Sequence, residues 1–191
     1  MPGRQAKLIT TAVLRRMLAR IRHSYTPERD RAIVLLSVKA GLRACEIARL
    51  DWSMVLSARG RIADAIELHD AIAKKGGGRR IPIHPDLANA LRALRQGTKG
   101  YGPVIRSSRG GAMRANSIVN WFVSLFAELE IDGCSSHSGR RSFITTAARN
   151  VHRVGCSLRD VQLLAGHRSI ETTQRYIDGH TDGQRKLVLL I

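Results

Sequence analysis

Apolar positions at helical spacing occupy most of the chain. From Thr10 they recur every three or four residues, at Val13, Leu14, Met17, Leu18 and Ile21, which is typical of an amphipathic helix. Thr26 and Pro27 provide a cap residue and a proline at a helix start, and Gly41 and Gly166 are helix stops. These patterns together predict helices over residues 10–21, 27–40, 44–50, 86–95, 115–129, 138–150, 157–165 and 169–176.

The spacing changes between the third and fourth predicted helices. Residues 52–55 read as a short strand, and residues 66–72 alternate between apolar and polar positions apart from Asp70. A basic, glycine-rich turn over residues 74–80 leads into residues 81–83, where Pro82 favours an edge strand. We therefore predict an α+β fold, mainly α-helical, with a small antiparallel β-sheet of about three strands.

Charge narrows the class of partner. The 191 residues include 32 Lys and Arg against 15 Asp and Glu, a net charge of +17. This excess points to a polyanion, with nucleic acid ahead of a membrane surface. A solvated basic face without a partner is the alternative. No apolar run reaches the roughly 18 residues of a membrane span, so no membrane partner is expected.

Cysteine usage argues against a metal site. The three cysteines, Cys45, Cys134 and Cys156, are scattered and form no C-x-x-C pair, so neither a structural zinc site nor a disulfide framework is indicated. We expect no metal and no cofactor, and a reduced cytoplasmic setting.

Candidate chemistry concentrates near the carboxyl end. His137, Arg140, His167 and Tyr176 lie within 40 positions. They offer cations for a phosphate, proton acceptors and donors, and a phenol nucleophile. Each has a structural alternative: His137 as a helix cap, His167 as a C-terminal helix residue, and Tyr176 as a half-buried core residue.

Five separate motifs, in this order, resemble the catalytic domain of the tyrosine recombinases, the family of phage integrases and chromosome-dimer resolvases. Residues 40–47, AGLRACEI, match the first arginine box, and Lys74, eight residues before Pro82, matches the lysine of the strand hairpin. His137 and Arg140 match the H-x-x-R box. Gly166-His167, and Tyr176 nine residues after His167, match the final box. The resemblance runs from about Thr10 almost to the end of the chain.

The resemblance implies a metal-independent, site-specific DNA recombinase or integrase that cleaves and rejoins strands through a 3′-phosphotyrosine intermediate. Arg43 and Arg140 would bind the scissile phosphate, and Tyr176 would attack it. Lys74 would protonate the leaving oxygen, with Lys75 as its alternative. His137 would accept the tyrosine proton, and His167 would bind the phosphate and hold the helix of Tyr176.

Supporting contacts follow from charge and position. Glu46, three residues after Arg43, is expected to orient an arginine. Basic and polar residues in the turns and at one helix start are expected to contact DNA, without a readable base-specific role: Lys75, Arg79, Arg80, Arg106, Arg109, Arg114 and Asn116.

Two departures from the family pattern bear on organisation. The family usually has H-x-L-R, whereas here Ser138 and Gly139 lie between His137 and Arg140. Arg141 is a second candidate for the arginine of this motif. Only 42 residues precede Arg43, which resembles the small single-domain recombinases of the fimbrial phase-switch type. We expect a flexible segment over residues 1–9, a catalytic domain over residues 10–180 and a tail over residues 181–191.

Assembly and setting follow from the same resemblance. We expect a homotetramer on paired sites of double-stranded DNA and a monomer in free solution. The expected location is the nucleoid of a bacterial or phage-infected cytoplasm, and the expected target is a mobile element. The apolar tail, residues 187–191, docks on a neighbouring subunit or packs on its own core. The competing functions are a DNA-binding regulator or decoy without strand exchange, and a relaxing nickase similar to type IB topoisomerases.

Overall fold

The computed structural model describes residues 6–72, 78–98, 100–176 and 188–189. Two compact units divide the chain, Met1–Phe143 and Ile144–Ile191. The boundary falls within one helix, α6 (Ser138–Asn150). Each unit is described by itself.

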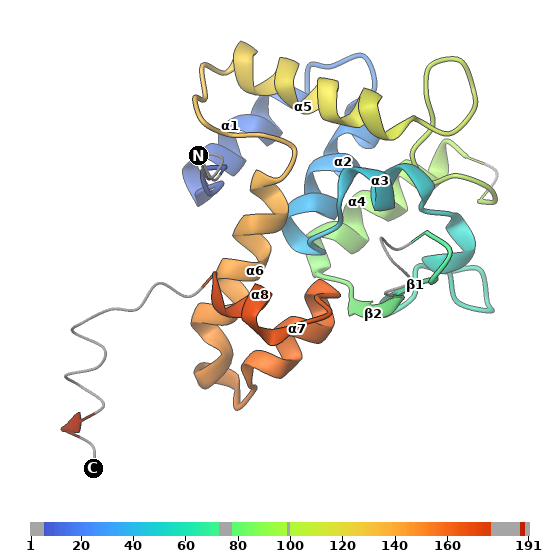
Figure 1. The fold of residues 1–191 in the computed structure, drawn as a ribbon. Coiled ribbons are helices and arrows are strands. Elements are labelled where there is room, and N and C mark those ends of the chain that lie inside the picture. Colours follow the sequence, from blue (N-terminus) through green and yellow to red (C-terminus); the bar gives the residue numbers. More distant parts are fainter. Residues whose placement is uncertain (1–5, 73–77, 99, 177–187, 190–191) are drawn as a thin grey trace. The chain divides into compact units, whose positions relative to one another are not determined.

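The first unit is built from helices that begin and end at the predicted signals (Figure 1). These are α1 (Thr11–Ile21), α2 (Pro27–Lys39), α3 (Ala44–Arg49), α4 (Pro85–Gln96) and α5 (Ala115–Glu128). The Thr10 hydroxyl accepts the first-turn N–H of Val13 at 3.2 Å, and Pro27 opens α2. Helix α2 packs against α1, α3 and α4, and α3 packs against α5. The buried side chains of α2 include Ile33, Leu35 and Leu36, so α2 is the centre of the apolar core.

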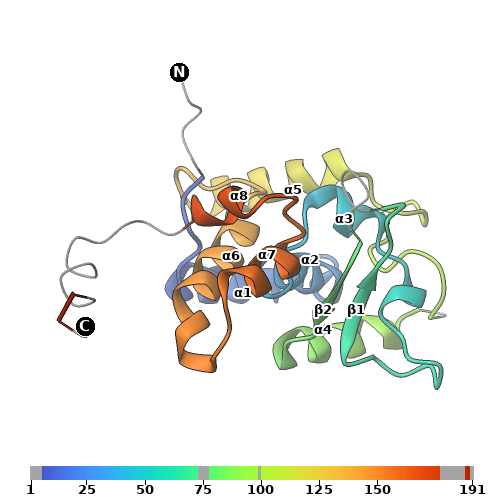
Figure 2. The same cartoon turned by 60° about the horizontal axis from the view of Figure 1, so that its bottom comes forward.

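The sheet of the described residues is a hairpin of two antiparallel strands, β1 (Ala65–Leu68) and β2 (Arg79–Pro82), which lie side by side in Figure 2. The register pairs Leu68 with Arg79 and Glu67 with Arg80. Since side chains alternate along a strand, neighbours on β2 face opposite sides of the sheet. Ile81 is buried on one side, and Arg80 is 71% exposed on the other.

Three strand predictions need correction. Residues 52–55 form no strand: the Asp51 carboxylate accepts the N–H of Ser53 at 3.0 Å and starts a 3₁₀ helix, η1 (Trp52–Met54). The strand predicted over residues 66–72 ends at Leu68, and Asp70 instead accepts the N–H of Gly78 at 2.7 Å. The described residues therefore form a sheet of two strands rather than about three. Leu56 and Ile62 form an isolated antiparallel β-bridge.

The described part of the predicted flexible N-terminus is held by the first unit. The N–H of Lys7 donates to the carbonyl of Gly133 at 2.8 Å. The N–H of Ile9 donates to the Ser142 hydroxyl at 2.7 Å, and the Ile9 side chain belongs to the core. Residues 6–9 are thus paired rather than free, and residues 1–5 lie outside the described part.

The second unit holds the rest of α6, a 3₁₀ helix η2 (Val151–Val154), α7 (Leu158–Ala165) and α8 (Ile170–Gln174). A capping pair starts α7, because the Asp160 carboxylate accepts from the N–H and hydroxyl of Ser157 at 2.8 and 2.9 Å. Gly166 ends α7 with a φ of +61°, a left-handed conformation that favours glycine. Helix α7 packs against α8, so two short elements stabilise each other.

Candidate functional site

Arg43 is fixed at the start of α3 by a buried carboxylate. Glu46 accepts the backbone N–H of Arg43 at 2.9 Å and its Nη1 at 2.8 Å. The Glu46 side chain is fully buried, and that of Arg43 remains 21% exposed. Glu46 thus holds both the backbone and the side chain of Arg43, and the Arg43 side chain remains partly exposed.

A second arginine binds the same carboxylate. Arg79, from β2, donates Nη1 to Oε1 of Glu46 at 3.1 Å and Nη2 to Oε2 at 3.0 Å. Its side chain is 5% exposed. The prediction of Arg79 as a surface phosphate ligand is therefore corrected: strand alternation turns it inward, on the side of Ile81, where Glu46 is its partner.

The protonation of Glu46 follows from these contacts. Burial raises the pKa of Glu46, but the hydrogen bond and charge of Arg79, and then those of Arg43, outweigh it and hold the pKa below its usual value. The side chain is an anion at neutral pH between two guanidinium groups.

We expect a pH-dependent stability from this carboxylate. Because its folded pKa is depressed, its contribution is complete above the ordinary glutamate pKa of about 4.3 and is lost as pH falls through the lower folded value. Glu46→Gln should lower the free energy of unfolding by about 3 kcal/mol at pH 7, since it leaves Arg79 buried without its anion. The difference from wild type should shrink below about pH 4. Urea unfolding at several pH values measures it, with the exposed Glu130→Gln as control; a gap independent of pH would contradict the assignment.

Arg140 lies against the loop that carries Arg43. Its Nη1 donates to the carbonyl oxygen of Gly41 at 2.6 Å, and the residue is 5% exposed. Gly41 has a φ of +64°, and a Cβ there would lie 2.4 Å from the Phe143 ring, so only glycine fits this turn. The first and second arginine boxes, 97 positions apart in the sequence, thus share one loop of the first unit.

Gly139 explains the departure from H-x-L-R. A Cβ at this position would meet the Ser37 hydroxyl of α2 at 2.2 Å. The absence of a side chain therefore lets the first turn of α6 lie directly on α2. Arg141 donates instead to the carbonyl of Ala6, so of the two neighbouring arginines it is Arg140 that binds the loop of the first arginine box.

His137 precedes α6 and is exposed. Its backbone N–H donates to the Ser135 hydroxyl at 3.2 Å, and its carbonyl accepts the N–H of Arg141 at 2.9 Å. The backbone is therefore fixed by the turn while the side chain remains accessible, as its predicted role as acceptor of the tyrosine proton requires.

The second unit holds the other two predicted catalytic residues together. His167 and Tyr176 stack with ring centroids 5.7 Å apart and planes 22° apart. Nδ1 of His167 lies 3.0 Å from the hydroxyl of Thr173, and the N–H of Tyr176 donates to the carbonyl of Thr173 at 3.0 Å. Tyr176 lies two residues after the end of α8 and is half-buried. His167 thus contacts both Thr173 and Tyr176 in the turn that carries the tyrosine.

Among the predicted DNA contacts, Arg80, Arg109, Arg114 and Asn116 are exposed. Arg106 is not a simple surface cation: its Nη1 and Nη2 donate to the carbonyls of Gly110 at 3.3 Å and Tyr101 at 3.2 Å. This guanidinium shapes the basic loop before α5, which presents Arg109. Lys74 and Lys75 lie outside the described residues.

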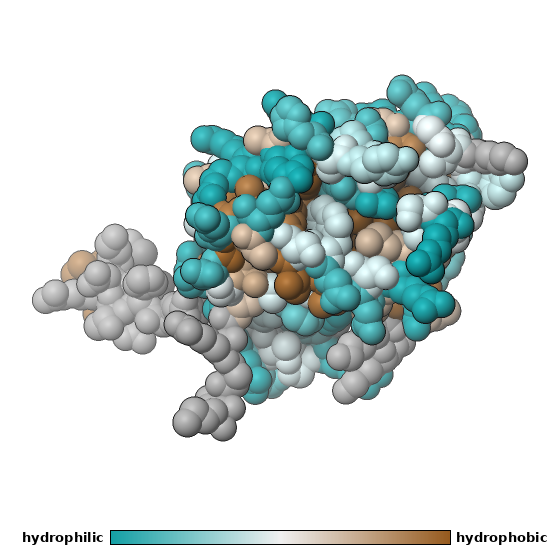
Figure 3. Space-filling model, turned by 90° about the horizontal axis from the view of Figure 1, so that it is seen from above, coloured by the Kyte–Doolittle hydropathy of each residue, from teal (hydrophilic) through white to brown (hydrophobic). Residues whose placement is uncertain are grey.

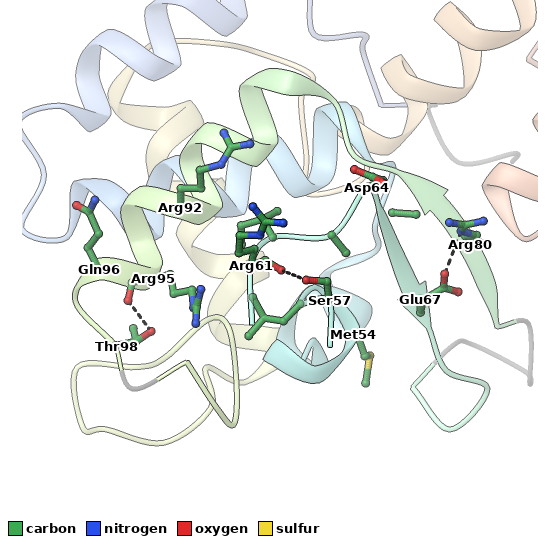
Figure 4. A pocket seen from close by; sticks show the side chains of 14 residues that line it. Met54, Ser57, Arg61, Asp64, Glu67, Arg80, Arg92, Arg95, Gln96 and Thr98 are labelled. Atoms are coloured by element: carbon green, nitrogen blue, oxygen red, sulfur yellow. Dashed lines mark hydrogen bonds and ion pairs between the residues drawn. The ribbon is translucent and has the colours of Figure 1, made fainter. Parts of the chain in front are cut away.

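A separate groove of about 1000 Å³ lies on the exposed side of the hairpin (Figure 4). Arg80, which pairs with Glu67 at 3.0 Å, lines it together with Arg61, Arg92 and Arg95. Of the predicted catalytic residues that the structure describes, none lines this groove. The groove is therefore a basic surface that is separate from Arg43, Arg79 and Arg140.

The surface and side-chain inventory agree with a polar partner. Hydrophilic side chains cover most of the face seen in Figure 3, with smaller apolar areas between them. Within the described ranges, no helix has the length and apolar character to cross a membrane. The same residues contain no group of three His, Cys, Asp or Glu side chains able to hold a metal ion.

Comparison with known proteins agrees with this geometry. A family model described as the phage integrase family matches residues 7–182. The tyrosine recombinase XerC of Nitrobacter winogradskyi is 28% identical over 156 residues, covering 78% of this chain and 45% of that protein. The tyrosine recombinase XerA of Thermococcus kodakarensis is 28% identical over 193 residues, covering 97% of this chain and 62% of that protein. The chain thus spans about half the length of such relatives.

The fold also matches solved structures. The Tn1549 transposon integrase, in complex with a circular intermediate DNA, superposes with a TM-score of 0.76 at 20% identity, covering 100% of this chain and 67% of that one. At this identity the likeness shows the fold. The predicted mainly helical fold with a small antiparallel sheet is confirmed.

Proposed function

Because the chain belongs to the phage integrase family, we propose that it is a site-specific recombinase that cleaves and rejoins DNA strands through Tyr176. The observation that carries the proposal is the arrangement within each unit. Arg43 and Arg140 meet at one loop of the first unit, and Tyr176 is held on His167 in the second. A partly exposed guanidinium and a stacked phenol support strand cleavage over DNA binding alone.

The proposed reaction balances without a cofactor. The Tyr176 oxygen attacks the phosphorus, the bond from phosphorus to the 5′-oxygen breaks, and a 3′-phosphotyrosine and a free 5′-hydroxyl result. His137 accepts the phenol proton, and Lys74 supplies the proton for the leaving oxygen. Reversal by a 5′-hydroxyl of another strand rejoins the DNA, since the covalent intermediate retains the phosphodiester energy.

The arginines supply the electrostatics of this step. The pentacoordinate transition state gains negative charge on its non-bridging oxygens. Guanidinium groups held in place beforehand bind this charge with little reorganisation, and such donors typically contribute about 10²–10³ in rate each. The Glu46 and Gly41 contacts provide that placement for Arg43 and Arg140.

The proposal is tested by trapping. A duplex from the DNA flanking the gene, nicked close to the cleavage site, loses its short 5′-hydroxyl fragment on cleavage, so the adduct cannot reverse. A slowly migrating protein–DNA band on a denaturing gel is expected. DNA binding without such a band would favour the regulator function. If the protein neither bound the DNA nor formed the band, both functions would be refuted.

The role of Lys74 is tested with a modified leaving group. Lys74→Ala should slow cleavage of ordinary DNA by about 10²–10⁴. Cleavage should recover on DNA with a bridging 5′-sulfur, because a thiolate leaves without protonation. Single-turnover rates on the two substrates measure the effect, with Lys75→Ala as the matched variant. Recovery confined to Lys75→Ala would transfer the acid role to Lys75.

We propose further that the active form is a homotetramer on paired DNA sites, held in part by the tail. Val188 and Leu189, the described residues of the tail, are 69% and 81% exposed, and burial of such side chains would favour assembly. Ending the chain after Arg185 should weaken assembly of tetramers on DNA more than binding of one subunit. Sedimentation with one-site and two-site DNA measures both, and an equal loss would favour a self-packed tail.

A further inference from the structure

Arg79 makes the most enclosed ion pair of the described residues, and it does so beside the catalytic arginine. Both of its terminal nitrogens bind Glu46, at 3.1 and 3.0 Å, in the two-point geometry that only arginine offers. The side chains are 5% and 0% exposed. Arg80, the next residue, is 71% exposed on the other side of the hairpin. The Arg79 side chain thus lies on the buried side of the hairpin.

Glu46 transmits the position of Arg79 to Arg43. Its Oε1 accepts from Nη1 of both arginines, at 2.8 Å from Arg43 and 3.1 Å from Arg79. Its Oε2 accepts the backbone N–H of Arg43 at 2.9 Å and Nη2 of Arg79 at 3.0 Å. A carboxylate held at both oxygens from two directions cannot rotate. It therefore fixes the position of the Arg43 Nη1, and of the backbone N–H of Arg43, relative to β2.

Charge gives Arg79 a second effect. Arg43, Glu46 and Arg79 together carry one net positive charge. Without Arg79, the Glu46 anion would face Arg43 alone, and the pair would be neutral. Since Coulomb interactions act strongly in a buried setting, the attraction of Arg43 for a phosphate would fall although Arg43 itself is unchanged.

We propose that Arg79 is a positioning residue for DNA cleavage: through Glu46 it orients Arg43 and offsets the Glu46 charge, so that Arg43 keeps its attraction for the scissile phosphate. The inference rests on the proposed function. Arg79 does not touch DNA, and it acts on the phosphate-binding step rather than on protonation of the leaving oxygen.

The first test compares matched arginine variants. Arg79→Met should slow single-turnover cleavage by about 10–10²-fold with little change in DNA affinity, since a small misplacement at the reacting centre has effects of this size. Arg29→Met is the control, because Arg29 also pairs with a buried carboxylate, Asp30 at 2.8 Å, on α2. It should cleave at the wild-type rate. Arg79→Lys, which keeps the charge but not the planar fork, should lie in between.

The second test identifies the step. A methylphosphonate at the cleavage site lacks one anionic oxygen, so Arg43 matters less there, and the deficit of Arg79→Met should shrink on it. On DNA with a bridging 5′-sulfur the deficit should persist. The double variant Arg79→Met/Glu46→Gln restores one net positive charge and should recover part of the rate. Recovery on the sulfur substrate instead, or equal deficits on all substrates, would overturn the proposal.

A third measurement does not depend on catalysis. The ¹⁵N signal of Arg43 Nε, assigned by its loss in Arg43→Lys, is recorded in the DNA-free protein. Arg79→Met should shift and broaden it, and Arg29→Met should not. An unmoved Arg43 signal would overturn the positioning role even if the wild type forms an adduct. A shifted signal in a chain that forms no adduct would refute the proposed function and leave the positioning of Arg43 supported.

Discussion

A chain with phenylalanine in place of Tyr176 should bind DNA as tightly as the wild type and form no covalent adduct. Phenylalanine lacks the nucleophilic oxygen but keeps the ring, which stacks on His167 at 5.7 Å. The turn after α8 should therefore keep its conformation. A nicked suicide duplex on a denaturing gel measures the adduct, and a gel-shift titration measures binding.

The sequence offers complete controls for this variant. The chain has three tyrosines, and the other two, Tyr25 and Tyr101, are 97% and 61% exposed. Tyr25→Phe and Tyr101→Phe should form the adduct at the wild-type rate. An adduct that survives in Tyr176→Phe and disappears in either of the others would move the nucleophile to that position.

The second large effect is expected at Arg140. Arg140→Met should lower the single-turnover cleavage rate on saturating DNA by about 10²–10³-fold, because methionine keeps the apolar stem and loses every N–H donor. The guanidinium is held by the carbonyl of Gly41 at 2.6 Å, so the lost contribution is that of a fixed donor. Rapid-quench measurement of adduct formation gives the rate, and thermal unfolding checks the fold.

Arg141→Met is the matched control. Arg141 is the neighbouring arginine, and its guanidinium binds the carbonyl of Ala6 rather than Gly41. We expect cleavage near the wild-type rate at a slightly lower melting temperature. If Arg141→Met were the slower enzyme, the assignment of the H-x-x-R box to Arg140 would be wrong.

Local signals explain why the helices could be predicted. The start of α1 at Thr10, the Ser157–Asp160 pair before α7 and the end of α7 at Gly166 depend on residues within four positions of each other. The Arg43–Glu46 contact is equally local, three positions apart. A single sequence contains all the information that such features need.

Long-range contacts explain the failures. The partner of Arg79 lies 33 positions away and that of Arg140 lies 99 positions away, so neither could be deduced from one sequence. Arg79 carried one usable signal: it lies two positions before the apolar Ile81 and therefore on the same, buried side of the strand. Residues 52–55 were too few to distinguish the hydrophobic periodicity of a strand from that of a helix. The hydrogen bond from the N–H of Ser53 to the Asp51 carboxylate starts a 3₁₀ helix there instead.

The most direct test of the account is to locate the DNA on the protein. The trapped adduct is digested with nuclease and trypsin; cleavage after Arg175 and Arg185 releases residues 176–185, which contain one tyrosine. Mass spectrometry should find this peptide with a nucleotide attached through a 3′-phosphate on Tyr176. An unmodified peptide from the purified adduct, with the nucleotide on any other residue, would contradict the account.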